Sequence, residues 1–242
     1  MSTFLELCQD LRRELDISGT GPTTVVSQSG DLLNLVEWID QAYIDIQNRR
    51  NGNWRWMRRG YTLQTVANDD SYSFGDFTDV ILSATIDRFS RWRIVDSEDP
   101  PMVFLTSAGV GTQRWFVWTQ WDWFKHLYRI GTQNAGAPVF VASDPQDNLV
   151  FGPKPNDIYT ITGDYWRSAQ VLSNDGTADP NDAVPEMPVQ FHKLVVWEAM
   201  LHYGYQQAAP EVLARAEKFS RRMYRQLENN QFPKFKVGIP IA

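Results

Sequence analysis

The stretch GDLLNLVEWIDQAYIDIQNRRNGNWRWMRR, residues 30–59, decides how this chain folds. Its apolar residues recur at the spacing of one helix face, and the residues between them are polar. A stripe of this kind predicts a helix that packs one side against a core. The apolar set is Leu32, Leu35, Val36, Ile39, Tyr43 and Ile46.

The ends of this helix carry their own signals. Ser29 is the expected N-cap, and Asp31 places negative charge at the positive end of the helix dipole. Arg49 and Arg50 lie at the negative end, and Gly52 ends the helix. The residues that follow predict a packed corner where a strand pattern begins: Trp54, Trp56 and Met57.

Three further helices are expected outside this stretch. Thr3 and Glu6 have the spacing of a capping box, and the apolar residues after them predict a helix over residues 3–15. A loop rich in Gly, Thr and Ser returns the chain over residues 18–30. Near the other end, Pro188 and Pro210 open two helices. One face of the first of these is formed by Phe191, Leu194, Val195, Glu198, Leu201 and Tyr205, and the stripe of the second is Val212, Ala216, Phe219, Met223 and Leu227.

The middle of the chain has strand patterns. From residue 61 onward, β-branched and aromatic residues alternate with polar ones. Residues 138–142 and 149–151 flank the turn sequence DPQDN, and together with residues 159–166 they predict one three-stranded sheet. The run from 107 to 130 fits either strands or a short helix from 121 to 128. Other expected strands cover residues 80–82, 85–95, 103–105 and 114–119.

These elements predict an α+β fold in which the N- and C-terminal helix pairs form a four-helix bundle, with an antiparallel β-domain inserted between the two pairs in the sequence. The predicted segments are a first helix pair (1–59), the β-rich domain (60–170), a second helix pair (171–230) and an extended C-terminal arm (231–242). The connection over residues 169–188 is polar, acidic and expected to be exposed. The arm spaces apolar residues among two prolines and a glycine without a helical period.

Composition narrows the function classes. The formal net charge of -6 argues against non-specific nucleic-acid binding over the whole surface. The single cysteine, Cys8, lies on the apolar stripe of the first helix and is expected to be a small core residue. Aromatic residues make up 13% of the chain, with 10 tryptophans, which indicates a large surface to bury in a core or an interface.

No membrane or targeting signal is evident in the sequence. It lacks an N-terminal basic region followed by an apolar run. No stretch approaches the roughly 20 apolar residues that span a bilayer. We therefore expect a protein that is cytosolic at synthesis and has no membrane partner.

No catalytic, cofactor or metal site can be assembled from the sequence. His126, His192 and His202 lack metal-ligand spacing. Two glycine-containing segments, 19–21 and 107–111, have no Walker lysine and no flanking βαβ unit. Acidic pairs at 69–70, 96–99 and 179–182 have the polar, turn-like context of solvated loops. We therefore expect a protein that is not an enzyme and needs no cofactor.

Two surfaces remain as candidates for binding. One is a basic face on the last helix, which is either solvated or contacts a phosphate or an acidic partner: Arg215, Lys218, Arg222 and Arg225. The other is an aromatic set that favours core or subunit packing over stacking on bases or sugars: Trp115, Phe116, Trp118, Trp121, Trp123 and Phe124.

The order of these segments resembles the head-to-tail adaptor (connector) proteins of tailed bacteriophages. The N-terminal stretch FLELCQDLRRELDISGTGPTTVVSQSGDLLNLVEWIDQAYIDIQNRRNGNWRWM carries the most specific part, namely a first helix, a GTGP loop and a second helix that leads into WxW. Three more stretches resemble the family: NLVFGPKPNDIYTITGDYWRSAQVL, VPEMPVQFHKLVVWEAMLHYG and APEVLARAEKFSRRMYRQL. Residues 76–137 match least.

The resemblance implies a structural virion protein at the head–tail junction. Such proteins form a ring, usually of twelve copies, between the portal of the head and a tail or nozzle protein. The ring encloses the channel through which double-stranded DNA passes, without specific binding, during packaging and ejection. The resemblance also implies that the C-terminal arm binds the portal, through Phe232, Phe235, Val237, Ile239 and Ile241.

Two other functions remain open on the sequence. The tryptophan-rich region and the loop acids favour a carbohydrate-binding or glycan-processing tail component. The basic face of the last helix favours a nucleic-acid-binding module, whose affinity would fall steeply with salt.

Overall fold

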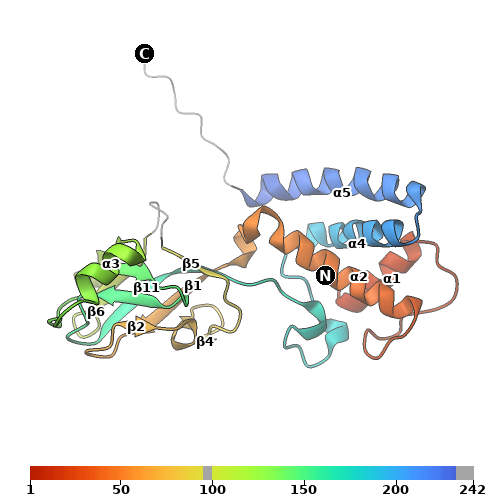
Figure 1. The fold of residues 1–242 in the computed structure, drawn as a ribbon. Helices are drawn as coiled ribbons and strands as arrows, with labels where there is room; N and C mark the ends of the chain where they lie inside the picture. The colour runs from red at the N-terminus through yellow and green to blue at the C-terminus, as the bar shows by residue number, and fades with distance from the viewer. Residues whose placement is uncertain (95–99, 233–242) are drawn as a thin grey trace, which may run out of the picture. The chain divides into compact units, whose positions relative to one another are not determined.

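The computed structural model describes residues 1–94 and 100–232. The chain divides into two compact units, a helical unit (Met1–Trp56 and the chain from Ala169 onward) and a sheet unit (Met57–Ser168). Figure 1 shows four long helices in the first unit, and strands with one short helix in the second. The expected α+β class is confirmed.

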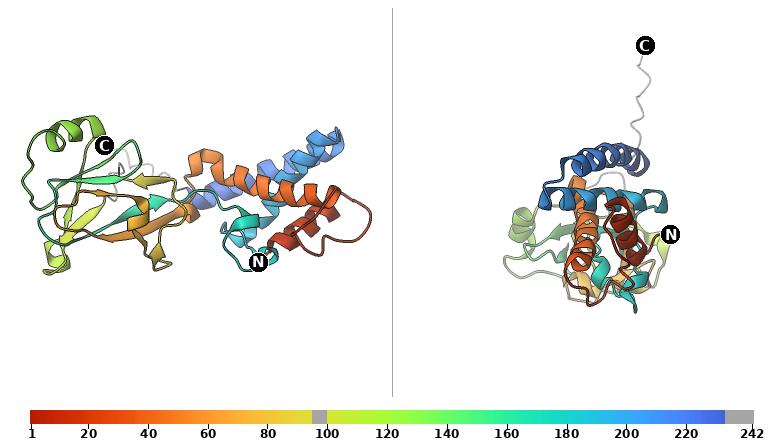
Figure 2. Two further views of the ribbon diagram at one scale, coloured as in Figure 1. Left: turned by 60° about the horizontal axis from the view of Figure 1, so that its bottom comes forward. Right: turned by 90° about the vertical axis from the view of Figure 1, so that its right-hand side faces the viewer.

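Four helices make up the helical unit. They are α1 (Phe4–Glu14), α2 (Asp31–Asn48), α4 (His192–Gln206) and α5 (Pro210–Gln231). Helix α4 packs against each of the other three and lies between α5 and the pair α1 and α2 (Figures 1 and 2). Its apolar residues point to more than one side, which suits this central position. Those that are fully buried are Leu194, Val195, Val196, Ala199 and Met200.

The predicted helix starts are confirmed at α1 and α5 and wrong at α2. Thr3 caps α1 in a complete capping box with Glu6, and Pro210 opens α5. At α2 the N-cap is Gly30 rather than Ser29. Gly30 adopts a φ of 59°, which glycine reaches without strain, so the chain turns one residue later than the capping pattern indicates.

The loop between α1 and α2 is held by Arg12, a buried cation. Its Nη1 donates to the Gly21 carbonyl at 2.7 Å and its Nε to the Ile17 carbonyl at 3.2 Å, and Nη2 donates to the Ser18 carbonyl. Because carbonyl groups hold each of its nitrogens, the charge is satisfied without a carboxylate.

The connection over residues 169–188 is largely exposed from 173 to 182, as expected, and its two ends are tied to the helical unit. Gln47 donates to the Gln170 carbonyl at 2.9 Å and accepts from the Gln170 backbone N–H at 2.8 Å. Tyr43 donates to the Gln170 side chain at 3.0 Å, and the Leu172 N–H donates to Asp40 at 2.7 Å. The ends of the connection therefore contribute Leu172, Ala183 and Met187 to the core of the helical unit.

Eleven strands lie in the described part of the sheet unit, in two sheets. One sheet has the order β4-β3-β1-β11-β6-β7, with β5 also pairing with β11, and the other has the order β2-β10-β9-β8. The bounds are β1 Arg58–Gln64, β2 Ser71–Tyr72, β3 Thr78–Asp79, β4 Ala84–Thr85, β5 Arg91–Arg93, β6 Met102–Leu105, β7 Arg114–Trp115, β8 Val117–Trp118, β9 Phe140–Ser143, β10 Leu149–Gly152 and β11 Tyr159–Trp166.

The central pair of the larger sheet is β1 and β11. They run antiparallel from Arg58 opposite Trp166 to Gln64 opposite Thr160. Their inward residues pack with residues of the smaller sheet in one buried cluster. This shared core includes Tyr61, Phe77, Trp92, Val103, Leu149, Phe151, Ile161 and Tyr165.

Several strand predictions need correction. The predicted three-stranded sheet is wrong because β10 pairs with β9 and β2, while β11 lies in the other sheet between β1 on one side and β5 and β6 on the other. The predicted strand at 80–82 is a turn. The predicted strand at 114–119 is split at Phe116, whose N–H donates to the Pro101 carbonyl. These outcomes depend on distant partners, which local patterns do not reveal.

The sheets are antiparallel except where β8 runs parallel to β9, and at one isolated parallel bridge. The run that fitted either strands or a helix contains both: β7 and β8 are followed by α3 (Trp121–Tyr128). In the residues that the structure describes, no helix is long and apolar enough to cross a membrane.

Candidate functional site

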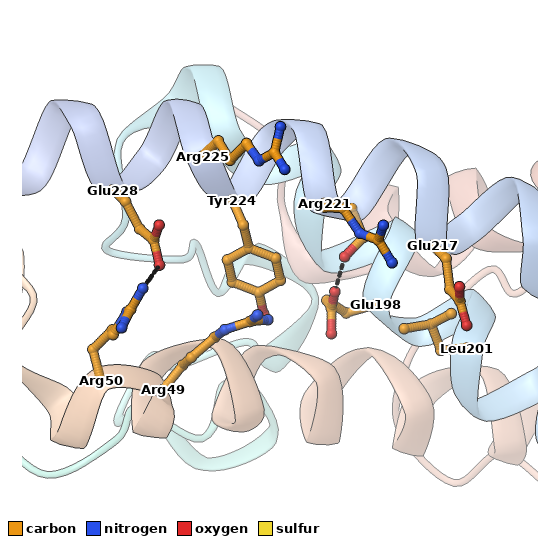
Figure 3. A pocket seen from close by; sticks show the side chains of 10 residues that line it. Arg49, Arg50, Glu198, Leu201, Glu217, Arg221, Tyr224, Arg225 and Glu228 are labelled. Carbon is orange, nitrogen blue, oxygen red and sulfur yellow. Dashed lines mark hydrogen bonds and ion pairs between the residues drawn. The ribbon is translucent and has the colours of Figure 1, made fainter.

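The first candidate site is a cavity of about 330 Å³ in the helical unit, where α5 passes over α4 and the end of α2. Figure 3 shows its charged side chains facing one another from the three elements. It is lined by Arg49, Arg50, Glu198, Leu201, Glu217, Ser220, Arg221, Tyr224, Arg225 and Glu228.

Two arginines at the end of α2 hold α5. Arg49 is the C-cap of α2 and has an extended conformation, and its guanidinium carbon lies 3.7 Å from the centre of the Tyr224 ring. Arg50 turns the chain with a φ of 58°, and its Nε donates to the Glu228 carboxylate at 2.9 Å. The cation–π contact and the ion pair together join the corner after α2 to the last helix.

Glu198 is the carboxylate at the bottom of the cavity. Burial raises its pKa above the ordinary value, although the Ser220 hydroxyl, which donates to it, and the nearby Arg49 oppose that shift. Burial and the charge of Glu198 raise the pKa of Tyr224 as well. The lining has four arginines and three glutamates, so its charges nearly balance, which suits a structural contact between helices better than capture of a strong anion.

The basic residues predicted on the last helix do not gather at one place. Arg215 contacts Glu14, to whose carboxylate its Nη2 lies at 3.1 Å, and its guanidinium carbon lies 5.9 Å from the Trp197 ring. Arg225 lines the cavity, and Lys218 and Arg222 are exposed. The sequence reading missed the roles of Arg49 and Arg50. The spacing of Tyr224 and Glu228, four residues apart on one helix, could have revealed their common partner surface.

We expect the two arginine contacts to respond differently to salt. Arg49→Ala should lower the free energy of unfolding by about 1 kcal/mol, because a planar stack on Tyr224 is lost, and the loss should persist at about 1 M NaCl. Arg50→Ala should cost less than about 1 kcal/mol at low salt and almost nothing at about 1 M, because an exposed ion pair is screened.

Urea unfolding of both variants and the parent at the two salt concentrations, followed by circular dichroism, checks this pair. Equal salt dependence of the two variants would contradict the assignment of a stacking role to Arg49.

The second candidate site is an aromatic groove of about 340 Å³ in the sheet unit. Of the predicted aromatic set, Phe116 and Phe124 are buried, Trp121 is half-buried, and Trp115, Trp118 and Trp123 are exposed. The Trp123 ring stands edge-on to Phe140 with 5.7 Å between ring centres. The aromatic groove is lined by Val117, Trp118, Thr119, Gln120, Trp123 and Phe140.

The residues predicted for the C-terminal arm fall mostly outside the described part of the chain. Gln231 ends α5, and Phe232 follows it with its ring 5.4 Å from that of Trp54. Phe232 therefore fixes the end of α5 against the packed corner predicted after α2. The remaining arm residues, Phe235, Val237, Ile239 and Ile241, lie outside the described residues.

The candidate ligand residues are dispersed. Across residues 1–94 and 100–232, no group of three or more His, Cys, Asp or Glu side chains is placed to hold a metal ion. His126 is exposed, His192 is buried beside the Met187 carbonyl, and His202 lies 3.3 Å from the Asp45 carboxylate.

Cys8 is buried, and burial raises its pKa. Of the acidic pairs, Asp70 contacts Arg129 and Asp179 caps a short turn, while residues 96–99 are outside the description.

The sequence matches one family model over nearly its whole length. That model is described as SU10 adaptor protein, and it matches residues 2–233. The chain belongs to the SU10 adaptor protein family. This membership confirms the resemblance to phage adaptors. The chain, called the adaptor from here on, is therefore a structural protein of a bacteriophage virion. Its family is generally non-enzymatic. The family implies partners at the portal and the tail. No curated protein matches the adaptor.

Proposed function

We propose that this adaptor is one subunit of a ring, usually of twelve copies in such proteins, that joins the portal of the phage head to the tail and encloses the DNA channel. The observation that carries the proposal is the family match over residues 2–233, which includes both units. The exposed tryptophans of the sheet unit support it, since a monomer gains nothing by exposing them.

Each segment has a place in this proposal. The two helix pairs (1–59 and 171–230) form one four-helix bundle, residues 60–170 are the inserted β-domain, and residues 231–242 are an arm that binds the portal. A tail or nozzle protein binds the ring on the side that faces away from the portal. The net charge of -6 suits a channel that passes double-stranded DNA without gripping it, because each phosphate neutralised by a Lys or Arg adds attraction.

The basic face of α5 takes an acidic partner in this proposal. Lys218 and Arg222 are exposed on it. A protein surface at the portal or the tail supplies the acidic groups. Arg215, which also contacts Glu14, and Arg225, which lines the cavity, are the outer members of the predicted basic set. Rim charges of this kind govern the rate and the specificity of docking more than its affinity.

Removing the arm is the test of the portal contact. A chain that ends at Phe232 keeps the contact with Trp54, so it should unfold at the same temperature as the full chain. It should lose co-sedimentation with purified portal rings, because Phe235, Val237, Ile239 and Ile241 are absent. Light scattering and negative-stain microscopy of the full chain with portal provide the reference.

Two outcomes would count against this role of the arm. Insolubility of the shortened chain would make the arm part of the core. Undiminished portal binding would place the portal contact elsewhere. A full-length chain that forms no ring, alone or on the portal, would overturn the ring itself.

A further inference from the structure

The aromatic groove runs along an open strand edge. Strand β8 is the last strand of the smaller sheet, and in the described part of that sheet it pairs only with β9. Four consecutive residues of this edge, 117–120, line the groove together with Trp123 and Phe140. The groove therefore lies where a further strand can be added to the sheet.

The backbone groups at this open edge are those of Trp118. The Val117 N–H donates to the Val139 carbonyl at 2.9 Å, and the Thr119 N–H donates to the Val141 carbonyl at 3.0 Å. Because successive residues of a strand direct their backbone groups to opposite edges, the N–H and C=O of Trp118 point away from β9. They are available to an added strand.

The open edge is short. On the same side of the strand as Trp118, the Phe116 N–H donates to the Pro101 carbonyl at 2.9 Å, so the edge opens only after Phe116. Gln120 is still extended, with φ -68° and ψ 146°, and α3 begins at the next residue. The edge over residues 118–120 suits one short strand, in the mode by which many domains bind an extended peptide.

The side chains of the groove select an uncharged segment. None of its six lining residues is charged, so a buried charge would find no partner there. Trp118 and Trp123 are 38% and 47% exposed and offer apolar surface. Thr119 is only 9% exposed, and its hydroxyl has no hydrogen-bond partner among residues 1–94 and 100–232. The fitting ligand is extended and apolar, and its backbone supplies polar groups.

The chain contains a segment with this pattern, in the arm. Residues 233–242, PKFKVGIPIA, lie outside the described part of the structure. Every second side chain from 235 onward is large and apolar, and residues 237–242 carry no charge. A period of two predicts a strand with one apolar face. That face consists of Phe235, Val237, Ile239 and Ile241.

The position of Pro240 is compatible with such a strand. It lies between Ile239 and Ile241, so its nitrogen, which has no hydrogen to donate, faces the edge opposite to the one at which those two residues pair. The arm can therefore pair with β8 through Ile239 and Ile241 without losing a hydrogen bond. The outer edge is then closed to a further strand by the proline.

We infer that the arm of one copy adds as a strand to β8 of a second copy, with Val237, Ile239 and Ile241 in the aromatic groove. This inference rests on the proposed function, in which the same arm binds the portal, so the two contacts exclude each other. The groove holds the arm until a portal is present. Exchange of one element between copies is a low-cost route to assembly, and it covers apolar surface on both sides.

A labelled peptide of residues 233–242 tests the contact. The chain that ends at Phe232 has the groove and lacks the arm, so it should bind the peptide saturably, as measured by fluorescence anisotropy. Trp123→Ala in that chain should weaken binding by about tenfold or more, because an exposed aromatic anchor is removed. The full chain should bind less peptide than the shortened chain, because arms already occupy its grooves.

Two matched peptides and one backbone readout separate strand addition from general stickiness. A peptide with Ile239→Asp should not bind, because it places a charge in the groove. A peptide with Lys236→Ala should bind like the parent, because that position is on the other face of the strand. Amide hydrogen exchange at Trp118 should slow when the peptide binds, which contact through side chains alone would not cause.

Cross-linking of full chains tests whether the contact joins two copies. Cys8 is the only native cysteine and is buried, so it does not interfere. Under mild oxidation, a mixture of the Ile239→Cys chain and the Trp123→Cys chain should give a covalent dimer of the two variants. Trp123→Ala in the full chain should bind portal rings at a lower portal concentration than the parent, because the arm is no longer held.

Four results would overturn the inference. They are absence of peptide binding, peptide binding that Trp123→Ala does not weaken, unchanged exchange at Trp118, and absence of the mixed dimer. Any of them, with portal binding by the full chain intact, would remove this contact and leave the proposed function. Peptide binding in the groove by a full chain that never binds the portal would instead be the failure of the proposed function.

Discussion

Replacing Trp54 by alanine should lower the free energy of unfolding by about 3–5 kcal/mol, the largest loss that we expect from a single substitution in the helical unit. Trp54 is fully buried, and its Nε1 donates to the Ile46 carbonyl at 2.8 Å. Its ring stacks on Trp56 with 4.9 Å between centres and lies against Phe232. The substitution would therefore remove a large apolar volume and leave a buried carbonyl without its donor.

Trp123→Ala is the matched control, because that side chain is 47% exposed and few of its contacts are lost. Trp123→Ala should lower the free energy of unfolding by less than about 1 kcal/mol. Urea unfolding of both variants, followed by circular dichroism, measures the difference. Equal losses would mean that the corner after α2 is not the part of the core that we describe.

Replacing Asp79 by alanine should lower the free energy of unfolding by roughly 3 kcal/mol or more and should loosen the turn formed by Val80, Ile81 and Leu82. The buried Tyr165 hydroxyl and the N–H groups of Ile81 and Leu82 would all lose their acceptor. Burial by itself would raise the pKa of Asp79, but these hydrogen bonds and the charge of Arg59 outweigh it, and the pKa is lowered. The carboxylate therefore favours its charged form in the folded protein.

The sign of this pKa shift gives a pH dependence. A lowered folded-state pKa contributes stability above the unfolded pKa of about 3.9, and this contribution is lost as the pH falls through the folded value. The difference in stability between the parent and Asp79→Ala should thus be full at neutral pH and shrink below about pH 4. Urea unfolding of the parent and of Asp79→Ala, at neutral pH and below about pH 4, measures this difference.

Asp76→Ala is the control for the Asp79 substitution. Asp76 is exposed and accepts only from Ser73, in a local capping box. Its replacement should therefore lower the free energy of unfolding by about 1 kcal/mol. If the difference in the free energy of unfolding between the parent and Asp79→Ala did not become smaller in acid, the role assigned to the charged carboxylate would be contradicted.

Local signals in the sequence were enough where an element is stabilised by its own neighbours. The capping box of Thr3 and Glu6 and the helix-opening Pro210 act within one turn, and both are confirmed. The apolar stripe of α2 is buried as its period predicts, with Leu35, Ile39 and Ile46 inaccessible to solvent.

Outcomes that depend on distant partners could not be predicted from the sequence. Val80, Ile81 and Leu82 have high strand propensity, but the Asp79 side chain, which accepts a hydrogen bond from the distant Tyr165 hydroxyl, also accepts from the Ile81 and Leu82 N–H groups and makes a turn. Strand β11 pairs with β1, far back along the chain, rather than with β10, which precedes it. The contact of Arg49 with Tyr224 likewise joins residues whose closeness exists only after the helices pack.

The chain enters and leaves the sheet unit at one point. Met57 and Arg167, at the two ends of the unit, are joined by a hydrogen bond of 2.9 Å from the Arg167 N–H to the Met57 carbonyl. A domain whose ends meet in this way behaves as a cassette: it can be exchanged or lost in evolution while the ends of the host remain the same distance apart. The helical unit can therefore receive a sheet unit of different sequence without a change in the distance between its own two chain ends.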